Sequence, residues 1–205
     1  MSLFPDSNQP NIIELRQVSH SYDGGDSFVL QNLNFLVEDK PAQGQFVVIL
    51  GPSGCGKSTV LRYIAGLQRP TSGEVLLNGQ PIDANNRVGM VFQQYSSLPW
   101  LTVLDNVSLA LAYQGVSEKE RQQKAMEMIT KVGLAGHENK FAQYPTLSGG
   151  QLQRVAIARS LMANQEILLM DEPFGALDIN TGLQMQDLLA DLWREIHPTV
   201  IFVTH

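Results

Sequence analysis

Hydrophobic residues form three short uninterrupted runs, and helical stretches separate these runs along the chain. The runs occupy residues 46–50, 167–170 and 200–203. Strands that are apolar at every position are typical of a parallel sheet whose two faces are covered by helices. The pattern therefore predicts an α/β fold in which all three runs are buried strands.

The N-terminal third has a different pattern, because polar and apolar positions alternate there. The alternating segments are 12–18, 29–37 and 74–77, and turn-forming sequences such as Asn78-Gly79 follow them. Alternation of this kind is typical of half-buried antiparallel strands. We expect a small antiparallel β layer at this end of the chain.

Helical periodicity dominates the middle of the chain. One predicted helix carries on one face Val103, Leu104, Val107 and Leu111. Ser117 followed by Glu120 is a capping-box pattern. It opens a second helix whose predicted core positions are Ala125, Met126, Ile129 and Val132. We predict a helical subdomain at 95–155, inserted into one discontinuous α/β core formed by 1–94 and 156–205.

Charge and cysteine content narrow the range of partners. The formal net charge is −6, which argues against a nucleic-acid backbone as the main partner. The single cysteine, Cys55, excludes an intrachain disulfide and fits a reducing compartment. The first residues lack the features of a secretory signal, and no apolar run approaches the ~20 residues that span a bilayer. We expect a water-soluble chain that reaches a membrane only through a partner.

The run at 46–50 leads directly into a glycine-rich loop that fits the phosphate-binding motif G-x-x-x-x-G-K-[ST]. The loop consists of Gly51, Pro52, Ser53, Gly54, Cys55, Gly56, Lys57, Ser58 and Thr59. Its glycines let backbone N–H groups point at a phosphate, and the helix that follows adds its positive end. Lys57 would bind the β- and γ-phosphates, and Ser58 would ligate Mg²⁺. The sequence therefore predicts a nucleotide site.

A phosphate loop alone leaves the class of protein open, because GTPases, kinases and helicases share it. Cys55 also has two interpretations. It is either a tolerated small residue or a thiol whose pKa the helix N-terminus lowers, so that alkylation would affect activity.

A second anion-binding helix start lies far along the chain from the first. The sequence 147–151 reads Leu-Ser-Gly-Gly-Gln, and the helical pattern after it has on one side Leu152, Val155, Ala156 and Leu161. Small residues before a helix leave its first N–H groups accessible to an anion. Two phosphate-binding sites in one chain need an explanation.

With these motifs the chain resembles the ATP-binding cassette (ABC) family, the nucleotide-hydrolysing subunits of ABC transporters, over nearly its whole length. The resemblance implies a P-loop NTPase (RecA-like) core that binds ATP and Mg²⁺. It also implies a head-to-tail dimer, either a homodimer or a pair with a paralogous ABC subunit. The residues that would contact the ATP held by the partner's phosphate loop are Ser148, Gly149, Gly150 and Gln151.

The same resemblance assigns roles around the γ-phosphate. Asp171 would hold Mg²⁺ through water, and Glu172 would orient and polarise the attacking water. Gln93, in preference to the adjacent Gln94, resembles the glutamine that contacts Mg²⁺ and connects the core to the helical subdomain. His205 resembles the switch histidine that contacts the γ-phosphate and helps to hold the water.

Two more positions resemble elements of the family. Tyr22 resembles the aromatic residue that stacks on adenine, although a tyrosine at a strand edge is the alternative. Asp178 resembles the acidic residue of the D-loop, which crosses the dimer interface. The remaining histidines have no motif context, and we expect His20, His137 and His197 to lie at the surface.

The resemblance implies an ATPase subunit on the cytoplasmic face of the cell membrane. It would energise an importer through an integral membrane permease, with a solute-binding protein as an indirect partner. Tyr95, Leu98 and Trp100 are either permease contacts or subdomain core. The stretches 92–107 and 171–178 are similar to those of importers for nitrate, sulfonate, taurine and bicarbonate. Polyamine and sugar importers share parts of both stretches, so the cargo stays open.

Two other functions compete with this one. A soluble ABC protein acting on DNA repair or ribosomes usually carries two cassettes or a basic surface, which this acidic single cassette lacks. A non-hydrolysing scaffold is the other, and Glu172, Gln93 and His205 argue against it. Family members continue beyond the position of His205 with further strands and helices, so the resemblance predicts a chain truncated at its C-terminus.

Overall fold

The computed structural model describes residues 11–23, 27–40, 44–83, 86–94, 96–163 and 166–205. The chain divides into two compact units. The first comprises Met1–Gln43, Ile49–Val88 and His205, and the second comprises Gly44–Val48 and Gly89–Thr204. Strand β3 (Phe46–Leu50) contains residues of both units.

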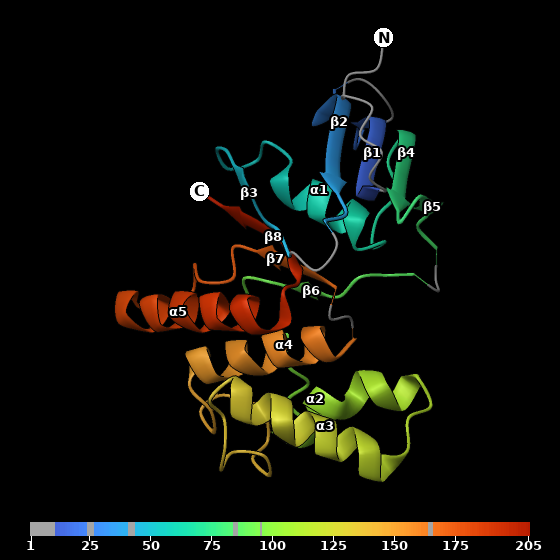
Figure 1. The fold of residues 1–205 in the computed structure, drawn as a ribbon. Coiled ribbons are helices and arrows are strands. Elements are labelled where there is room, and N and C mark those ends of the chain that lie inside the picture. The colour runs from blue at the N-terminus through green and yellow to red at the C-terminus, as the bar shows by residue number, and fades with distance from the viewer. Residues whose placement is uncertain (1–10, 24–26, 41–43, 84–85, 95, 164–165) are drawn as a thin grey trace. The chain divides into compact units, whose positions relative to one another are not determined.

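The first unit is built on an antiparallel sheet, as the alternating segments predict. Its strands are β1 (Asn11–His20), β2 (Leu30–Glu38), β4 (Ser72–Leu77) and β5 (Gln80–Pro81). They pair in the order β2-β1-β4-β5, and Figure 1 shows β2, β1 and β4 side by side. Helix α1 (Lys57–Ile64) packs against β4 and buries Leu61 and Ile64. Buried apolar side chains of the sheet and of this helix form the core of the unit.

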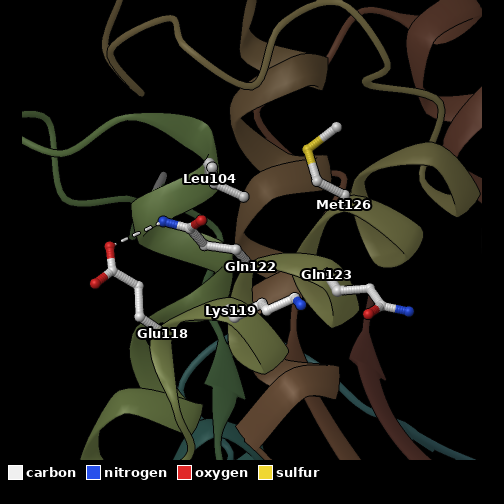
Figure 2. Close-up of a pocket in the computed structure, with 6 residues that line it drawn as sticks. All are labelled: Leu104, Glu118, Lys119, Gln122, Gln123 and Met126. Atoms are coloured by element: carbon white, nitrogen blue, oxygen red, sulfur yellow. Dashed lines mark hydrogen bonds between the residues drawn. The ribbon is translucent and has the colours of Figure 1, made fainter.

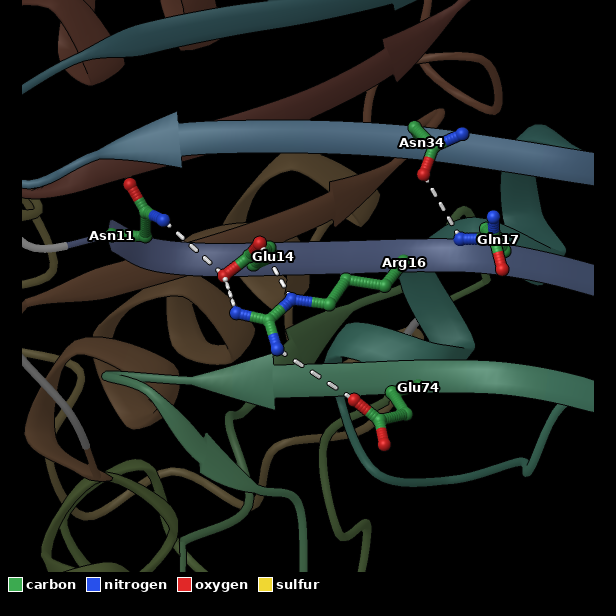
Figure 3. Close-up of polar contacts among 6 residues, drawn as sticks. All are labelled: Asn11, Glu14, Arg16, Gln17, Asn34 and Glu74. Carbon is green, nitrogen blue, oxygen red and sulfur yellow. Dashed lines mark hydrogen bonds and ion pairs between the residues drawn. The ribbon is translucent and has the colours of Figure 1, made fainter. Parts of the chain in front are cut away.

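A bulge interrupts β1 near its middle. The register of β1 against β2 and β4 shifts around Gln17, which has a φ of 49° and donates its backbone N–H to Asn34 Oδ1 at 3.0 Å. Arg16 pairs with Glu14 at 2.7 Å and lies 3.8 Å from Glu74, so polar contacts cover the bulge (Figure 3). The Arg16 hydrogen bond lowers the pKa of the Glu14 carboxyl.

This bulge decides which residues at the end of β1 are buried. An unbroken strand alternates between its two faces, but Val18, Ser19 and His20 are consecutive and all buried, because a bulge breaks the two-residue period. Gly73 of β4 permits the bulge, since a Cβ there would lie 2.5 Å from the Gln17 carbonyl oxygen. The prediction that His20 lies at the surface is therefore wrong.

The second sheet has the order β3-β8-β7-β6, with β6 (Met90–Val91), β7 (Ile167–Asp171) and β8 (Thr199–Thr204) parallel. The strands predicted at 167–170 and 200–203 are confirmed, and Ile167–Met170 is buried throughout. β3 differs, because Phe46, Val48 and Leu50 are exposed. The prediction that this strand is buried at every position is wrong, since exposed and half-buried residues alternate along it and the face that carries Phe46, Val48 and Leu50 is only partly covered.

Helices complete the second unit. Helix α4 (Gly149–Ala163) lies between α5 (Ile179–Ile196) and the pair α2 (Val103–Tyr113) and α3 (Glu118–Lys131) (Figure 1). The side chains predicted for the core face of α4 are buried, namely Leu152, Val155, Ala156 and Leu161. Of the helices in the described ranges, none is both long and apolar enough to cross a lipid bilayer.

The N-cap predicted for α3 is present, because Ser117 Oγ accepts the Glu120 N–H at 3.4 Å, which is one of the two hydrogen bonds of a capping box. The predicted core positions of α3 are buried except one: Met126 is exposed, and Met128 is buried in its place. Residues 125, 128, 129 and 132 form the i, i+3, i+4, i+7 stripe of a helix, which position 126 does not join. The prediction that Met126 is core is therefore wrong.

The region around Met126 is a shallow surface hollow. Figure 2 shows Met126 near half-buried Leu104 of α2 and Gln122 of α3, and the Gln122 amide donates to Glu118 at 3.2 Å. This hollow lies on the outer side of α2 and α3, with polar side chains around it.

Candidate functional site

The predicted phosphate loop joins β3 to α1 and contains two left-handed glycines. Gly54 has a φ of 79° and Gly56 a φ of 96°, a region that L side chains rarely adopt. Gly56 is also closely packed, because a Cβ there would lie 2.7 Å from Leu30 Cδ2. Residues 52–55 are exposed. The loop is therefore open to a ligand, and its shape depends on these glycines.

Lys57, the first residue of α1, places its charge inside the loop. Its side chain is buried, and its Nζ donates to the backbone oxygens of Gly51 at 2.8 Å and Pro52 at 2.9 Å. Gly56 is the N-cap of α1 and provides no side-chain hydrogen bond. The ammonium group and the positive end of the helix therefore converge on one anion site. Ser58 is half-buried in the first turn of the same helix.

The thiol of Cys55 is free and exposed at the same loop. It lies beside Gly51, because a Cβ on Gly51 would be 2.9 Å from Cys55 Sγ. Sensitivity of the protein to alkylation at this thiol stays a prediction.

Tyr22 lies beside the end of the phosphate loop. Its hydroxyl is 3.4 Å from Thr59 Oγ1, and this hydrogen bond lowers the pKa of Tyr22. The ring remains 65% exposed. An aromatic surface open to solvent next to a phosphate site is suitable for stacking with a nucleotide base.

In the second unit, Asp171 ends β7 and Glu172 follows it in a strained turn. Glu172 has a φ of 47°, which is uncommon outside glycine. Its N–H donates to the Val203 carbonyl of β8 at 3.0 Å, and its carbonyl accepts the Gly175 N–H at 3.1 Å. Ligands of open α/β sheets bind at this carboxyl end of the strands, and backbone strain of this kind gathers at functional sites.

Gln93 lies against the same turn. A Cβ on Gly175 would be 2.9 Å from Gln93 Nε2, so the amide reaches the turn that Glu172 begins. The backbone before Gln93 is held by α4, because Gln153 Nε2 donates to the Phe92 carbonyl at 3.2 Å. The structure therefore brings Gln93 and the acidic turn together and connects both to α4.

The start of α4 carries a reciprocal pair of hydrogen bonds. The Ser148 N–H donates to Gln151 Oε1 at 2.9 Å, and Ser148 Oγ accepts the Gln151 N–H at 3.3 Å, which is a capping box. Gln151 Nε2 also lies 3.1 Å from His137 Nε2. Gly150 approaches α5, because a Cβ there would lie 2.5 Å from Thr181 Cγ2. The residues predicted to contact a phosphate thus also have structural roles at this helix start.

Asp178 is the N-cap of α5. Its Oδ1 accepts the Thr181 N–H at 3.1 Å, and this bond lowers the pKa of the carboxyl. Sequence reasoning placed Gln151 and Asp178 at a dimer interface and missed their capping roles. The Ser-x-x-Gln spacing and an aspartate directly before a helical pattern are the signals that would have found them.

The predicted site residues fall into two sets, one in each unit. The first unit contains the phosphate loop, Tyr22 and His205, which is exposed directly after β8. The second unit contains residues 148–151 together with Gln93, Asp171, Glu172 and Asp178. In the first unit Tyr22 lies beside Thr59 of the phosphate loop, and in the second Gln93 lies against the turn that Glu172 begins.

The predicted permease-contacting residues differ in burial. Trp100 is 68% exposed, so it is not part of the subdomain core. Leu98 is half-buried, and its N–H donates to Asn106 Oδ1 at 2.8 Å. Tyr95 lies outside the described residues.

Comparison with known proteins identifies the family of the chain. The sequence profile of the family described as ABC transporter matches residues 30–175, a span that includes the phosphate loop, Gln93 and the acidic turn. The chain belongs to the ABC transporter family. The identification of an ABC ATPase from its motifs is therefore confirmed.

Two relatives of this ABC ATPase match it along most of its length. The taurine import ATP-binding protein TauB of Escherichia coli O157:H7 is 46% identical over 191 residues, which cover 92% of this chain and 72% of TauB. The nitrate import ATP-binding protein NrtD of Synechocystis sp. is 43% identical over 196 residues, which cover 94% of this chain and 71% of NrtD. The chain is thus shorter than both relatives, as expected.

A solved ABC cassette has the same fold. The structure is described as a dimeric post-hydrolysis state of the ATP-binding cassette MJ0796 bound to ADP and Pi. It aligns with a TM-score of 0.77 and 38% identity, covering 94% of this chain and 88% of that chain. The α/β fold class predicted from the sequence is therefore confirmed.

Proposed function

We propose that this chain is the ATP-binding and ATP-hydrolysing subunit that energises a membrane importer. The observation that carries the proposal is the phosphate loop, with left-handed Gly54 and Gly56, buried Lys57 and a helix start without a side-chain cap. Support comes from TauB and NrtD, which are named import ATP-binding proteins, and from MJ0796, which was solved with ADP and Pi.

The loop from Gly51 to Thr59 holds the phosphates of ATP. Lys57 exchanges its bonds to the carbonyls of Gly51 and Pro52 for bonds to the β- and γ-phosphates, which are stronger because both partners are charged. Tyr22, fixed beside Thr59, stacks on adenine.

The donor set fits Mg²⁺. The Ser58 hydroxyl and the Gln93 amide oxygen would be direct oxygen ligands, and the Asp171 carboxylate would hold Mg²⁺ through one of the several waters that this ion commonly keeps. Such a site needs no cluster of ligating side chains, and the described residues contain no group of three or more His, Cys, Asp or Glu that could hold a metal. When bound, Mg²⁺ neutralises charge on the β- and γ-phosphate oxygens.

Hydrolysis depends on Glu172 and His205. The Glu172 carboxylate orients and polarises the attacking water, and its backbone bonds to Val203 and Gly175 fix the position from which it acts. His205 contacts the γ-phosphate and helps to hold this water. Phosphoryl transfer needs positioning and charge stabilisation more than covalent chemistry, so these groups suffice.

Two copies, or this chain and a paralogous subunit, form composite ATP sites. Residues 148–151 of one protomer close over the ATP held by the partner's phosphate loop, and Asp178 lies at the interface. A symmetric head-to-tail pair explains why one chain carries two anion-binding helix starts. The dimeric state of MJ0796 supports this arrangement.

The membrane partner is an integral permease, reached from the cytoplasmic face through the helical subdomain at 95–155. Exposed Trp100 is the best contact candidate, because large aromatic residues are enriched at protein interfaces. The names of TauB and NrtD support taurine or nitrate as cargo, and the resemblance of stretches 92–107 and 171–178 adds sulfonate and bicarbonate as candidates. A solute-binding protein would deliver the cargo to the permease. A polyamine or a sugar is the alternative cargo, and a role outside transport is the alternative function. Co-purification with a hydrophobic membrane subunit would distinguish a transport role from a role outside transport.

The decisive experiment compares Glu172→Gln with the wild-type chain. We expect the variant to bind ATP normally and to form an ATP-dependent dimer on a sizing column, while ATP hydrolysis falls by about 10²- to 10⁴-fold. Glu127→Gln, which alters an exposed residue of α3, is the matched control and should hydrolyse ATP at the wild-type rate. Normal turnover by Glu172→Gln would contradict the proposed role of this carboxylate.

A further inference from the structure

His20 is a buried histidine directly beneath the exposed ring of Tyr22. The His20 side chain is 6% exposed, and its ring centroid lies 4.3 Å from that of Tyr22 with the planes at 86°. Edge-to-face pairs at this separation are attractive. The bulge in β1 places His20 among the buried residues, and Tyr22 lies two residues further along the chain.

His20 is itself held from the far end of α1. Gln68 follows that helix, and its Nε2 lies 2.9 Å from His20 Nε2. The buried ring of Tyr63 in α1 also contacts the His20 ring, with the ring centroids 5.7 Å apart and the ring planes at 68°. Burial raises the pKa of Tyr63 to about 12, so this neighbour stays uncharged at ordinary pH. The imidazole is therefore fixed on more than one side.

The helix that begins at the phosphate loop thus also holds the Tyr22 ring. Thr59, at the start of α1, contacts the Tyr22 hydroxyl, and Gln68, after its end, contacts His20. Any base that stacks on Tyr22 would then lie at a fixed position relative to the phosphates. All of these residues belong to the first unit.

We propose that His20 is a positioning residue for the base of the bound nucleotide: it holds Tyr22 in place and so sets base affinity, without contributing to phosphate binding. This inference rests on the proposed function, in which Tyr22 stacks on adenine. Loss of His20 should weaken binding of ATP and leave binding of inorganic tripolyphosphate unchanged. A residue with a merely structural role would affect both ligands together.

The experiment measures ATP and tripolyphosphate affinities of the full chain by calorimetry. We expect His20→Ala to weaken ATP binding by about two- to tenfold, the range of one aromatic pair, with tripolyphosphate affinity unchanged. His20→Phe keeps a ring beneath Tyr22 and should restore most of the ATP affinity. His197→Asn changes an exposed histidine with a φ of 56°, a conformation that Asn tolerates, and is the control that should match the wild type.

Two further variants separate the possible failures. If His20 acts through Tyr22, then Tyr22→Ala combined with His20→Ala should lose no more ATP affinity than Tyr22→Ala alone. Equal losses for ATP and tripolyphosphate in His20→Ala, or additive losses in the double variant, would overturn the role of His20. Wild-type chain that binds neither ligand would instead overturn the proposed function, and with it this inference.

Discussion

Two helix starts in this ABC ATPase resemble each other in sequence and differ in how their first N–H groups are satisfied. Helix α1 begins after left-handed Gly56 without a side-chain cap, whereas α4 begins with a reciprocal capping box between Ser148 and Gln151. The first N–H groups of a helix need partners from outside the helix. The first N–H groups of α1 are open to a phosphate, whereas at α4 side chains of the same chain bind some of the backbone N–H groups. We therefore expect a single chain to bind ATP through α1 alone.

The largest expected effect is that of Lys57→Ala. This change removes the buried ammonium group from the open helix start, and truncating one partner of a buried charged contact costs about 2–5 kcal/mol, or roughly 30-fold or more in affinity. Calorimetry with ATP at low protein concentration measures it. Ser148→Ala is the matched change at the other helix start and should leave this affinity unchanged. Equal losses of ATP affinity in both variants would contradict the expectation that a single chain binds ATP through α1 alone.

The next effect separates the two left-handed glycines of the loop. Gly54→Ala introduces only the strain of a positive φ, since no atom lies within 4 Å of the new Cβ, and should lower the free energy of unfolding by about 1–2 kcal/mol. Gly56→Ala adds a 2.7 Å contact with Leu30, and overpacking contributes about 1–3 kcal/mol more. Urea unfolding of both variants measures the difference. Equal destabilisation would show that Leu30 yields to the added methyl group.

The phosphate loop was predictable because its geometry is encoded within a few consecutive residues. Glycines at fixed spacing determine where the backbone turns left-handed, and the helix after them is visible in the apolar pattern. The same holds for Asp171 and Glu172, which follow an apolar strand directly. The local structure of the loop and of the strand end could therefore be predicted from consecutive residues, and the roles of the residues in them stay predictions.

Side-chain burial that depends on pairing or packing with segments far apart in the sequence was not predictable from consecutive residues. His20 is buried because a bulge in β1 shifts the register against two neighbouring strands, and nothing in the alternating pattern reveals the bulge. Val48 is exposed because one face of β3 is only partly covered, which depends on tertiary packing and not on the composition of the strand. Met126 and Met128 are a different case, because Met128 joins the i, i+3, i+4, i+7 stripe of α3 and Met126 does not, so the sequence did contain the signal that separates them.

A smaller effect tests the capping box at α4. Gln151→Ala removes the acceptor of the Ser148 N–H, and loss of a helix cap typically costs about 0.5–2 kcal/mol. Gln122→Ala is the control, because it removes only an exposed contact with Glu118 on α3, which is expected to contribute about 0.2–0.5 kcal/mol. Thermal unfolding compares the two variants. If Gln151→Ala is no less stable than Gln122→Ala, then the bond from the Ser148 N–H to the Gln151 side chain does not stabilise α4.

The smallest effect concerns Asp178, which caps α5 as Ser148 caps α4 but carries a charge. Its hydrogen bond with Thr181 lowers its pKa in the folded chain, so the charged cap stabilises the fold at pH values above the unfolded pKa of about 3.9. This contribution is lost as the pH falls through the lowered folded pKa. The wild type should therefore melt at a higher temperature than Asp178→Asn at pH 7, and the gap should close as the pH falls below about 4. Asp187→Asn, at an exposed position on the same helix, should show no such gap. A gap between wild type and Asp178→Asn that is constant with pH would mean that the cap works through its shape and not through its charge.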